Sequence, residues 1–146
     1  MPRDSVRPCL REHSFGFIIQ TLARRTHKRM DAKLKEIDLD IKLFANLMLL
    51  STKDGVSQHS LSKSLDFPDY STSRHIDALV RAGYATRRED PDNRRVSLVF
   101  LTPEGRAKAA LLPPIIEEVN ASFLDVISPL ERRALMQSLR KVAHFE

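Results

Sequence analysis

The stretch from Leu61 to Arg106 constrains the fold most, because its hydrophobic pattern changes period along the chain. Apolar residues at helical spacing run from Asp69 to Ala82 and stop at Gly83, a common helix terminator. Beyond this glycine, apolar and polar residues alternate as they do in half-buried strands. The two expected strands are Tyr84–Glu89 and Arg95–Leu101, joined by the charged tip Asp90-Pro-Asp-Asn-Arg-Arg95. A helix followed by such a hairpin predicts a winged helix-turn-helix.

Helices are also expected on the N-terminal side of this stretch. Apolar spacing predicts a long helix over about residues 12–37, and Asp40 is a good N-cap for the next one. Ser57 or Ser60 can start a short third helix, and we expect Asp69 to cap the fourth. The sequence therefore predicts a mainly α fold with a small β-hairpin wing.

On the C-terminal side, two helix starts combine a hydroxyl N-cap with proline at the first helical position: Thr102-Pro103 and Ser128-Pro129. Between them Pro113-Pro114 must kink the helix, because neither proline donates a backbone hydrogen bond. Residues 111–127 hold more apolar side chains than one narrow stripe. A second copy of the chain is the expected cover, and the alternative is that the terminal helices cover one another.

The fourth helix has one apolar and one polar side. On a wheel of about 100° per residue, the side expected to face the core carries Thr72, Ile76, Leu79 and Val80. The other side carries Tyr70, Ser71 and Arg74, with Ser73 and His75 flanking it. Small hydroxyls and an arginine at the start of a helix suit the major groove of DNA, where arginine can grip guanine. Ordinary solvated charges are the alternative for this helix taken alone.

The charged tip favours the same interpretation. Its proline, aspartates and asparagine suit a turn, whereas Arg94 and Arg95 place two cations at an exposed point. The narrow minor groove attracts guanidinium groups. A solvated turn explains the tip equally well in isolation, but beside the fourth helix it favours contact with double-stranded DNA.

Three motifs carry a family resemblance: Leu61-x3-Leu65, Ser73-Arg-His-Ile-Asp-x-Leu79 with Gly83, and Asp90-Pro-Asp-Asn-Arg-Arg-Val-Ser-Leu-Val-Phe-Leu-Thr-Pro-Glu-Gly105. They resemble the multiple antibiotic resistance regulator (MarR) family. The resemblance implies homodimeric winged-helix repressors that bind short palindromes and release them on binding small phenolic or lipophilic ligands, or on oxidation. It also implies DNA contacts from the positions of Ser71, Ser73, Arg74 and Arg94.

The sequence departs from the family pattern at two positions. Asn93 stands where the family usually has an aspartate that braces the wing arginine, which puts the rigidity of the wing in doubt. Thr72 fills a position that is usually apolar, which should slightly weaken the packing of the recognition helix.

The resemblance and the patterns together predict one domain over residues 1–146. The winged helix-turn-helix lobe is expected at about 40–101, and dimerisation helices at about 12–37 and 103–146. A dimer would read half-sites about one helical turn apart. The alternative is a winged helix used for protein docking or RNA binding. Docking should present a larger apolar patch, and RNA binding needs aromatic residues for stacking, of which Tyr70 is the one candidate.

Charge and motif content narrow the function classes. The net charge of +5 favours an anionic partner, although most of the surplus lies in the first 35 residues. There is no P-loop, dinucleotide-binding turn, nucleophile elbow or HExxH pair, so we expect neither an enzyme nor a cofactor. A metal site needs several converging ligands, and the closest pairing among the five histidines is His27 with Asp31 at one helical turn, so no metal site is expected.

The remaining expectations concern location and signal. The apolar run Phe15–Ile19 is too short for a signal peptide or a membrane span, so we expect a cytoplasmic protein. Cys9, the single cysteine, lies in a proline-containing arm and is more simply incidental than a redox sensor. A ligand would most simply occupy the crevice between the first helix, the fifth helix and the winged-helix lobe. Phe15, Phe17 and Met30 could line it, and core packing explains them equally well.

Overall fold

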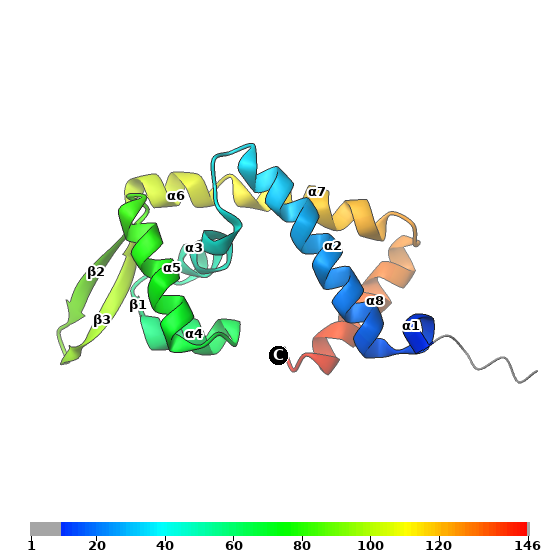
Figure 1. The fold of residues 1–146 in the computed structure, drawn as a ribbon, viewed down its shortest axis with the longest axis horizontal. Coiled ribbons are helices and arrows are strands. Elements are labelled where there is room, and N and C mark those ends of the chain that lie inside the picture. The colour runs from blue at the N-terminus through cyan, green and yellow to red at the C-terminus, as the bar shows by residue number, and fades with distance from the viewer. Residues whose placement is uncertain (1–9, 146) are drawn as a thin grey trace, which may run out of the picture.

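The computed structural model describes residues 10–145, as helices around a small sheet. The elements in chain order are α1 (Leu10–His13), α2 (Phe15–Lys35), α3 (Ile41–Thr52), β1 (Val56–Ser57), α4 (Gln58–Leu65), α5 (Asp69–Arg81), β2 (Ala85–Asp90), β3 (Asn93–Leu101), α6 (Pro103–Ala109), α7 (Leu112–Leu124) and α8 (Pro129–Val142). Figure 1 shows two groups of elements, with α6 and α7 running between them. We call α3 to α6 with the three strands the sheet lobe, and α1, α2, α7 and α8 the helical lobe.

The helices α3, α4 and α6 each begin at a residue whose side chain caps the helix. The Asp40 side chain accepts a hydrogen bond of 2.9 Å from the Lys42 amide, and Ser57 accepts one of 3.1 Å from the Ser60 amide. Thr102 accepts from the Gly105 amide at 3.0 Å. These caps satisfy amides that have no partner within the helix. The predicted long first helix is confirmed except for a break at Ser14, which separates α1 from α2.

The predicted cap of α5 is wrong by one residue. Asp69 is the first residue of the helix, and Pro68 is the N-cap, without a side-chain hydrogen bond. Proline takes this place because its fixed φ, here −61°, suits the extended backbone of a cap. The Pro68 carbonyl accepts from the amides of Ser71 and Thr72 at 3.1 and 3.2 Å. Asp69 still favours the helix, since a carboxylate in the first turn faces the positive end of the helix dipole.

The sheet has the order β1-β3-β2, with both pairs antiparallel. The two predicted strands are confirmed, whereas β1 was missed because two residues are too short to show a period. Val96, Leu98 and Phe100 share a half-buried face of β3, as expected from their spacing. The fully buried residues of this strand are on the opposite face, at Val99 and Leu101. Residues on both faces are therefore at least half-buried along this end of β3.

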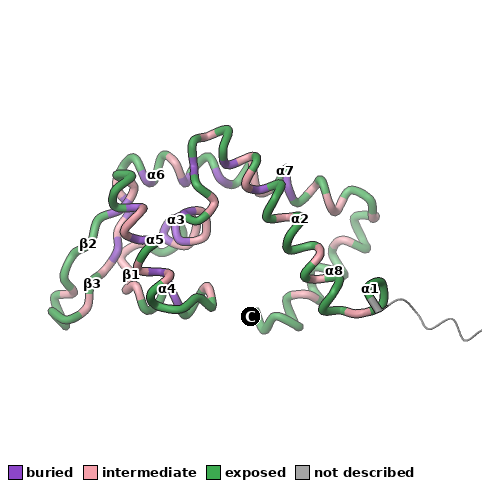
Figure 2. The backbone as a smooth tube through the Cα atoms, in the orientation of Figure 1, coloured by how far each residue is buried: buried purple, intermediate pink, exposed green. Residues whose placement is uncertain are grey.

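The core lies mainly in the sheet lobe and continues into the joint between the lobes (Figure 2). Leu47, Ile76, Leu79 and Val99 have no exposed surface. Leu34 of α2 and Leu112 of α7 extend the same core. Gly105 lets α6 approach the start of β2, because any Cβ at this position would clash with the Tyr84 carbonyl.

The two prolines after α6 break the helix instead of kinking it. The helix ends at Ala109, and both prolines lie in the first turn of α7, where a missing amide hydrogen bond costs little. The new helix packs on α2. Leu112 and Val119 are buried, and the Arg29 guanidinium lies 3.9 Å from the centre of the Phe123 ring. Much of the apolar surplus expected in residues 111–127 is therefore covered within one chain.

The contact between α2 and α7 also contains an ion pair. Lys33 Nζ lies 2.6 Å from Glu118 Oε1, and the hydrogen bond and charge of this carboxylate raise the pKa of Lys33.

The last helix, α8, begins with a capping box in which Ser128 and Glu131 exchange hydrogen bonds. No described residue of α8 is buried. None of the helices described in residues 10–145 is long and apolar enough to cross a membrane.

Candidate nucleic-acid interface

The helix α5 presents the polar side that its sequence predicts. Thr72, Ile76 and Leu79 have no exposed surface and fix the helix on the core. On the other side Tyr70 is 67% exposed and Arg74 is exposed, while Ser71 and Ser73 are half-buried. Val80 was expected in the core and is instead exposed, because it lies at the edge of the apolar stripe near the helix end. The start of α5 is thus a polar, accessible surface.

The threonine in the buried side of α5 has an energetic consequence. Thr72 Oγ1 is buried and has no hydrogen-bond partner. A buried hydroxyl without a partner costs about 1–3 kcal/mol. This agrees with the expectation that threonine weakens the packing of this helix.

The hairpin tip is held by two side chains. Asp90 Oδ1 accepts from the Asp92 amide at 2.9 Å, and Asn93 Oδ1 accepts from the Arg95 amide at 3.2 Å. Asparagine therefore keeps the turn closed through the backbone of Arg95 without holding a guanidinium. Arg94 and Arg95 are exposed, and within residues 10–145 neither makes an ion pair. Both charges are free to meet an anion.

Arg87 of β2 connects the hairpin to α5 and α4. Its Nη2 atom lies 2.7 Å from Asp77 Oδ1, donates to Gln58 Oε1 at 3.2 Å and reaches the Ser73 carbonyl at 3.5 Å. These contacts fix the angle between the hairpin and α5. Between the same elements lies a polar groove of about 710 Å³, whose walls include Ser73 and Arg95.

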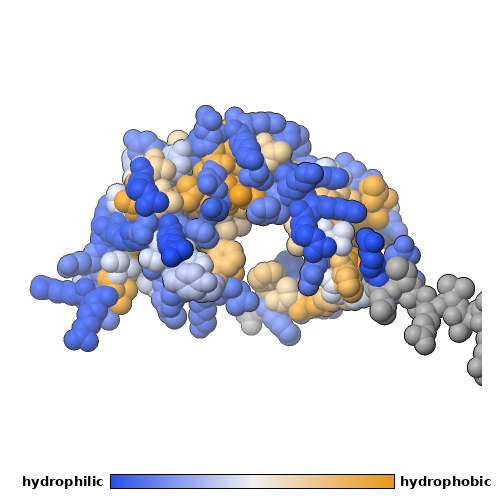
Figure 3. Space-filling model, in the orientation of Figure 1, coloured by the Kyte–Doolittle hydropathy of each residue, from blue (hydrophilic) through white to orange (hydrophobic). Residues whose placement is uncertain are grey.

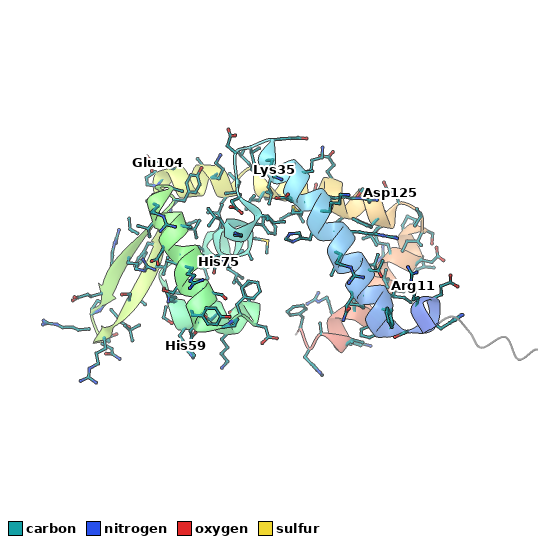
Figure 4. All side chains as sticks on the ribbon, viewed as in Figure 1. Arg11, Lys35, His59, His75, Glu104 and Asp125 are labelled. Atoms are coloured by element: carbon teal, nitrogen blue, oxygen red, sulfur yellow. The ribbon has the colours of Figure 1, made fainter. Side chains whose placement is uncertain are left out.

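The start of α5 and the tip of the hairpin lie along the same edge of the sheet lobe. In Figure 1 both point to the lower side of the molecule, away from α6. Figure 4 shows long side chains extending from the tip. One anionic rod along this edge would meet the helix and the hairpin together.

His75 lies partly away from this surface. It borders a groove beside Ser71 and Arg74, and also a pocket that faces α2. Its ring meets Phe67 edge to face at 6.1 Å, and its Nδ1 atom is buried without a hydrogen-bond partner. The structure therefore places His75 between the proposed DNA surface and the space between the lobes.

A family model, a relative in sequence and a solved structure each match this chain. The family model described as "MarR family" matches residues 44–96. The HTH-type transcriptional regulator YdgJ of Bacillus subtilis is 31% identical over 96 residues, which are 66% of this chain and 58% of that protein. The crystal structure of a MarR transcriptional regulator from Methanosarcina mazei superposes with a TM-score of 0.84 at 29% identity, over 88% of this chain and 93% of that one.

The chain belongs to the MarR family. A further MarR-family regulator, from Listeria monocytogenes, was solved in complex with a 26mer DNA. It matches with a TM-score of 0.80 and 25% identity, over 86% of this chain and 84% of that one. The family and these relatives are transcriptional regulators and not enzymes. The match spans 58% of the length of the B. subtilis relative.

Sequence reasoning missed one positioning residue of this MarR-family site. The residue is Arg87, whose contact with Asp77 the sequence analysis did not foresee. The available signal was two opposite charges on either side of the turn at Gly83, where a helix and a strand fold back on each other. Arg88, its neighbour, has a different role, because its guanidinium lies 4.6 Å from the centre of the Phe100 ring.

The structure tests some of the residues that could sense a signal. Met30 lines the pocket between α2 and the sheet lobe, whereas Phe15 and Phe17 are more than half exposed and do not. Cys9 and most of its arm lie outside the described residues. Within residues 10–145, no three His, Cys, Asp or Glu side chains are grouped so that they could hold a metal ion.

Proposed function

We propose that this MarR-family chain is a homodimeric regulator that binds a palindromic operator in double-stranded DNA. In this proposal it represses transcription and leaves the operator when a small phenolic or lipophilic molecule binds. The observation that carries the proposal is a set of exposed arginines on the sheet lobe, Arg74 on α5 and Arg94 and Arg95 on the wing. Among the described residues, none of the three has a carboxylate partner.

The start of α5 would enter the major groove. Its proposed contact residues are Tyr70, Ser71, Ser73, Arg74 and His75. An arginine that grips guanine with two hydrogen bonds discriminates by about 1–3 kcal/mol, so Arg74 should contribute most to base preference. The hydroxyls suit phosphates and base edges, and helix starts also favour phosphate.

The wing would lie along the adjacent minor groove. There Arg94 and Arg95 would meet the negative potential of the groove without reading bases closely. Arg87 would act indirectly, by holding the wing at a fixed angle to α5. The DNA complex of the L. monocytogenes relative supports this class of partner.

A homodimer is supported by the apolar surface left on the helical lobe. The exposed apolar residues of this lobe include Phe15, Phe17, Ile18 and Leu22 on α2, Leu130, Leu135, Met136 and Val142 on α8, and Phe145. Leu130 and Phe145 are 73% and 70% exposed. Apolar surface of this extent favours a partner, and a two-fold copy supplies the same surface. We therefore propose residues 12–37 and 103–146 as the dimerisation helices of a single domain, and residues 40–101 as its DNA-binding lobe.

Selection from random duplex DNA tests this function. We expect an enriched inverted repeat with half-sites about one helical turn apart, as two copies related by a two-fold axis require. Binding to it should weaken steeply with salt, because phosphate contacts release counterions. Failure to enrich any duplex would contradict the proposal, and retention of RNA or of another protein instead would favour the docking or RNA-binding alternative. The cytoplasm stays the predicted location.

A further inference from the structure

A histidine stands at the rim of the polar groove between α4, α5 and the wing. His59 lies in the first turn of α4, its side chain is 78% exposed, and it lines the groove together with Ser73 and Arg95. Figure 4 shows His59 on the lower side of α4, the side toward which the hairpin tip also points. Figure 3 shows hydrophilic side chains at that tip. His59 is therefore an exposed, titratable side chain on the edge proposed to meet DNA.

The path of the DNA over this edge crosses the groove. A duplex that receives α5 in its major groove and the wing in the adjacent minor groove has one sugar-phosphate strand between them, because neighbouring grooves are separated by a single strand. The groove of about 710 Å³ lies between the same two elements. A phosphate of that strand would therefore lie against the groove walls, to which His59 belongs.

The fixed charges around His59 cancel one another. The charged groups near it on neighbouring elements are Asp69 and Asp77 of α5, Arg87 of β2 and Arg95 of β3. Lys53 and Lys63, on α3 and α4, line a separate groove. Since the two carboxylates balance the two guanidinium groups, the protonation state of His59 decides whether the groove has a net positive charge. Histidine is the side chain that ordinarily changes charge between about pH 5 and 8.

The contact with Asp69 determines which ring nitrogen takes up the proton. Nδ1 of His59 lies 3.4 Å from Asp69 Oδ1, and a carboxylate only accepts, so Nδ1 keeps its hydrogen. In the neutral ring Nε2 then carries a lone pair, which repels a phosphate oxygen. Within residues 10–145 Nε2 has no hydrogen-bond partner. Protonation thus converts the open edge of the ring from an acceptor into a charged donor.

We propose that His59 is a proton-dependent phosphate contact, through which the DNA affinity of the dimer rises as the pH falls from about 8 to about 6. The cationic ring donates from Nε2 to a phosphate oxygen and adds one positive charge to the groove of each subunit. A phosphate that binds the cation better also favours the bound proton, so the contact is lost as the pH rises. The inference rests on the proposed function and adds a regulation of the same surface.

The first test measures affinity for the selected duplex at about pH 6, 7 and 8 and constant ionic strength, by fluorescence anisotropy. The parent should bind about tenfold more tightly at the lowest pH than at the highest, since a charge-assisted hydrogen bond is added in each of two subunits. His59→Gln has a neutral polar side chain and should bind at every pH about as the parent does at the highest. His59→Lys keeps its charge and should bind tightly at every pH.

His27→Gln is the matched control, because it makes the same change at an exposed histidine of α2, outside the groove. It should keep the pH dependence of the parent. The inference is overturned if the parent binds equally at all three pH values. It is also overturned if His59→Gln or His59→Lys gains as much affinity at low pH as the parent does.

The second test measures the number of phosphate contacts through the salt dependence. The slope of log affinity against log salt is about −0.9 for each phosphate neutralised. From high to low pH the slope of the parent should steepen by about two, one contact from each subunit, whereas the slope of His59→Gln should not change. A histidine that only stabilised α4 would alter affinity without altering this slope, and an unchanged slope in the parent overturns the inference.

The two proposals fail in different ways. If the parent binds a selected duplex with the same pH dependence as His59→Gln, the proposed function stands and the proton-dependent contact is wrong. If selection enriches no duplex at low or at high pH, the proposed function is wrong, and the contact at His59 is wrong with it.

Discussion

The helices α5 and α8 are both amphipathic and of similar length, but only α5 has a buried side. Three residues of α5 have no exposed surface, whereas no described residue of α8 is buried and Leu130 is 73% exposed. An apolar stripe therefore shows that a helix needs cover and does not show where the cover comes from. The sheet lobe supplies it within the chain, so the proposed DNA-reading edge is preformed. The helical lobe leaves it open, which is why we propose a second copy there.

Oligomeric state is the property in which we expect the largest effect. The double change Leu135→Glu and Met136→Glu places two charges in the half-exposed stripe of α8. We expect it to abolish dimerisation at micromolar concentrations, because unpaired charges in an apolar interface cost several kcal/mol. Sedimentation across a concentration series measures the change.

The matched control for this variant is Arg133→Glu with Gln137→Glu, at exposed polar positions of the same helix. It adds two acidic groups outside the apolar stripe and should leave the dimer intact. A parent chain that is monomeric at every concentration would refute the proposed cover of α8.

The second largest effect is expected in the free energy of unfolding, which should respond differently to changes in α5 and in α8. Leu79→Ala opens a cavity in the core and should lower the free energy of unfolding by about 2–5 kcal/mol. Leu130→Ala makes the same chemical change on α8 and should lower it by less than about 0.5 kcal/mol within one chain, since little buried area is lost. Denaturant unfolding at low protein concentration, where a dimer would dissociate, gives both values. Equal losses of stability in the two variants would contradict the difference in burial between α5 and α8.

Removing the contacts of Arg87 between the wing and α5 should have a smaller effect. Arg87→Met removes the contacts with Asp77 and Gln58 but keeps the aliphatic stem. We expect a loss of stability of about 1 kcal/mol or less, because the pair is partly exposed, and a several-fold loss of DNA affinity through a less fixed wing. Arg88→Met is the control, since it removes an equal charge from the same strand without touching α5. Equal DNA affinities for the two variants would show that charge alone matters.

The smallest effect is expected from the buried hydroxyl of α5. Thr72→Val keeps the shape of the side chain and removes an oxygen that has no partner. The free energy of unfolding should rise by about 1 kcal/mol, by the desolvation cost recovered. A thermal or denaturant transition that moves down instead would mean that the hydroxyl is satisfied, for example by an internal water.

Features set by neighbouring residues could be predicted from the sequence. The caps at Asp40, Ser57, Thr102 and Ser128 depend on a side chain and an amide two or three residues away. The sequence therefore identified three of them, and it gave Ser57 as one of two candidates beside Ser60. The same locality explains one error. Asp69 has the right chemistry for a cap, but the fixed backbone of the proline before it starts the helix one residue early.

Features that join distant segments could not be predicted in this way. Opposite charges on either side of Gly83 are a signal for the pairing of Arg87 with Asp77, but the geometry of the pair depends on the angle at which β2 leaves α5, and no residue pattern specifies that angle. The strand β1 exists because β3 offers it an edge, not because two residues favour a strand. The apolar surplus of residues 111–127 was identified, but α7 buries part of it on α2, while Val126 stays exposed and further uncovered residues lie on α2 and α8.

Titration of the selected duplex with Arg74→Ala and Arg94→Ala tests the central claim most directly. We expect Arg74→Ala to weaken binding by about tenfold or more and to relax the preference at one base pair of each half-site. Arg94→Ala should weaken binding with less change in preference and reduce the salt dependence. Arg24→Ala, an exposed arginine on α2, is the control and should bind like the parent. If both wing and helix variants also bind like the parent, the sheet lobe does not read DNA through this edge.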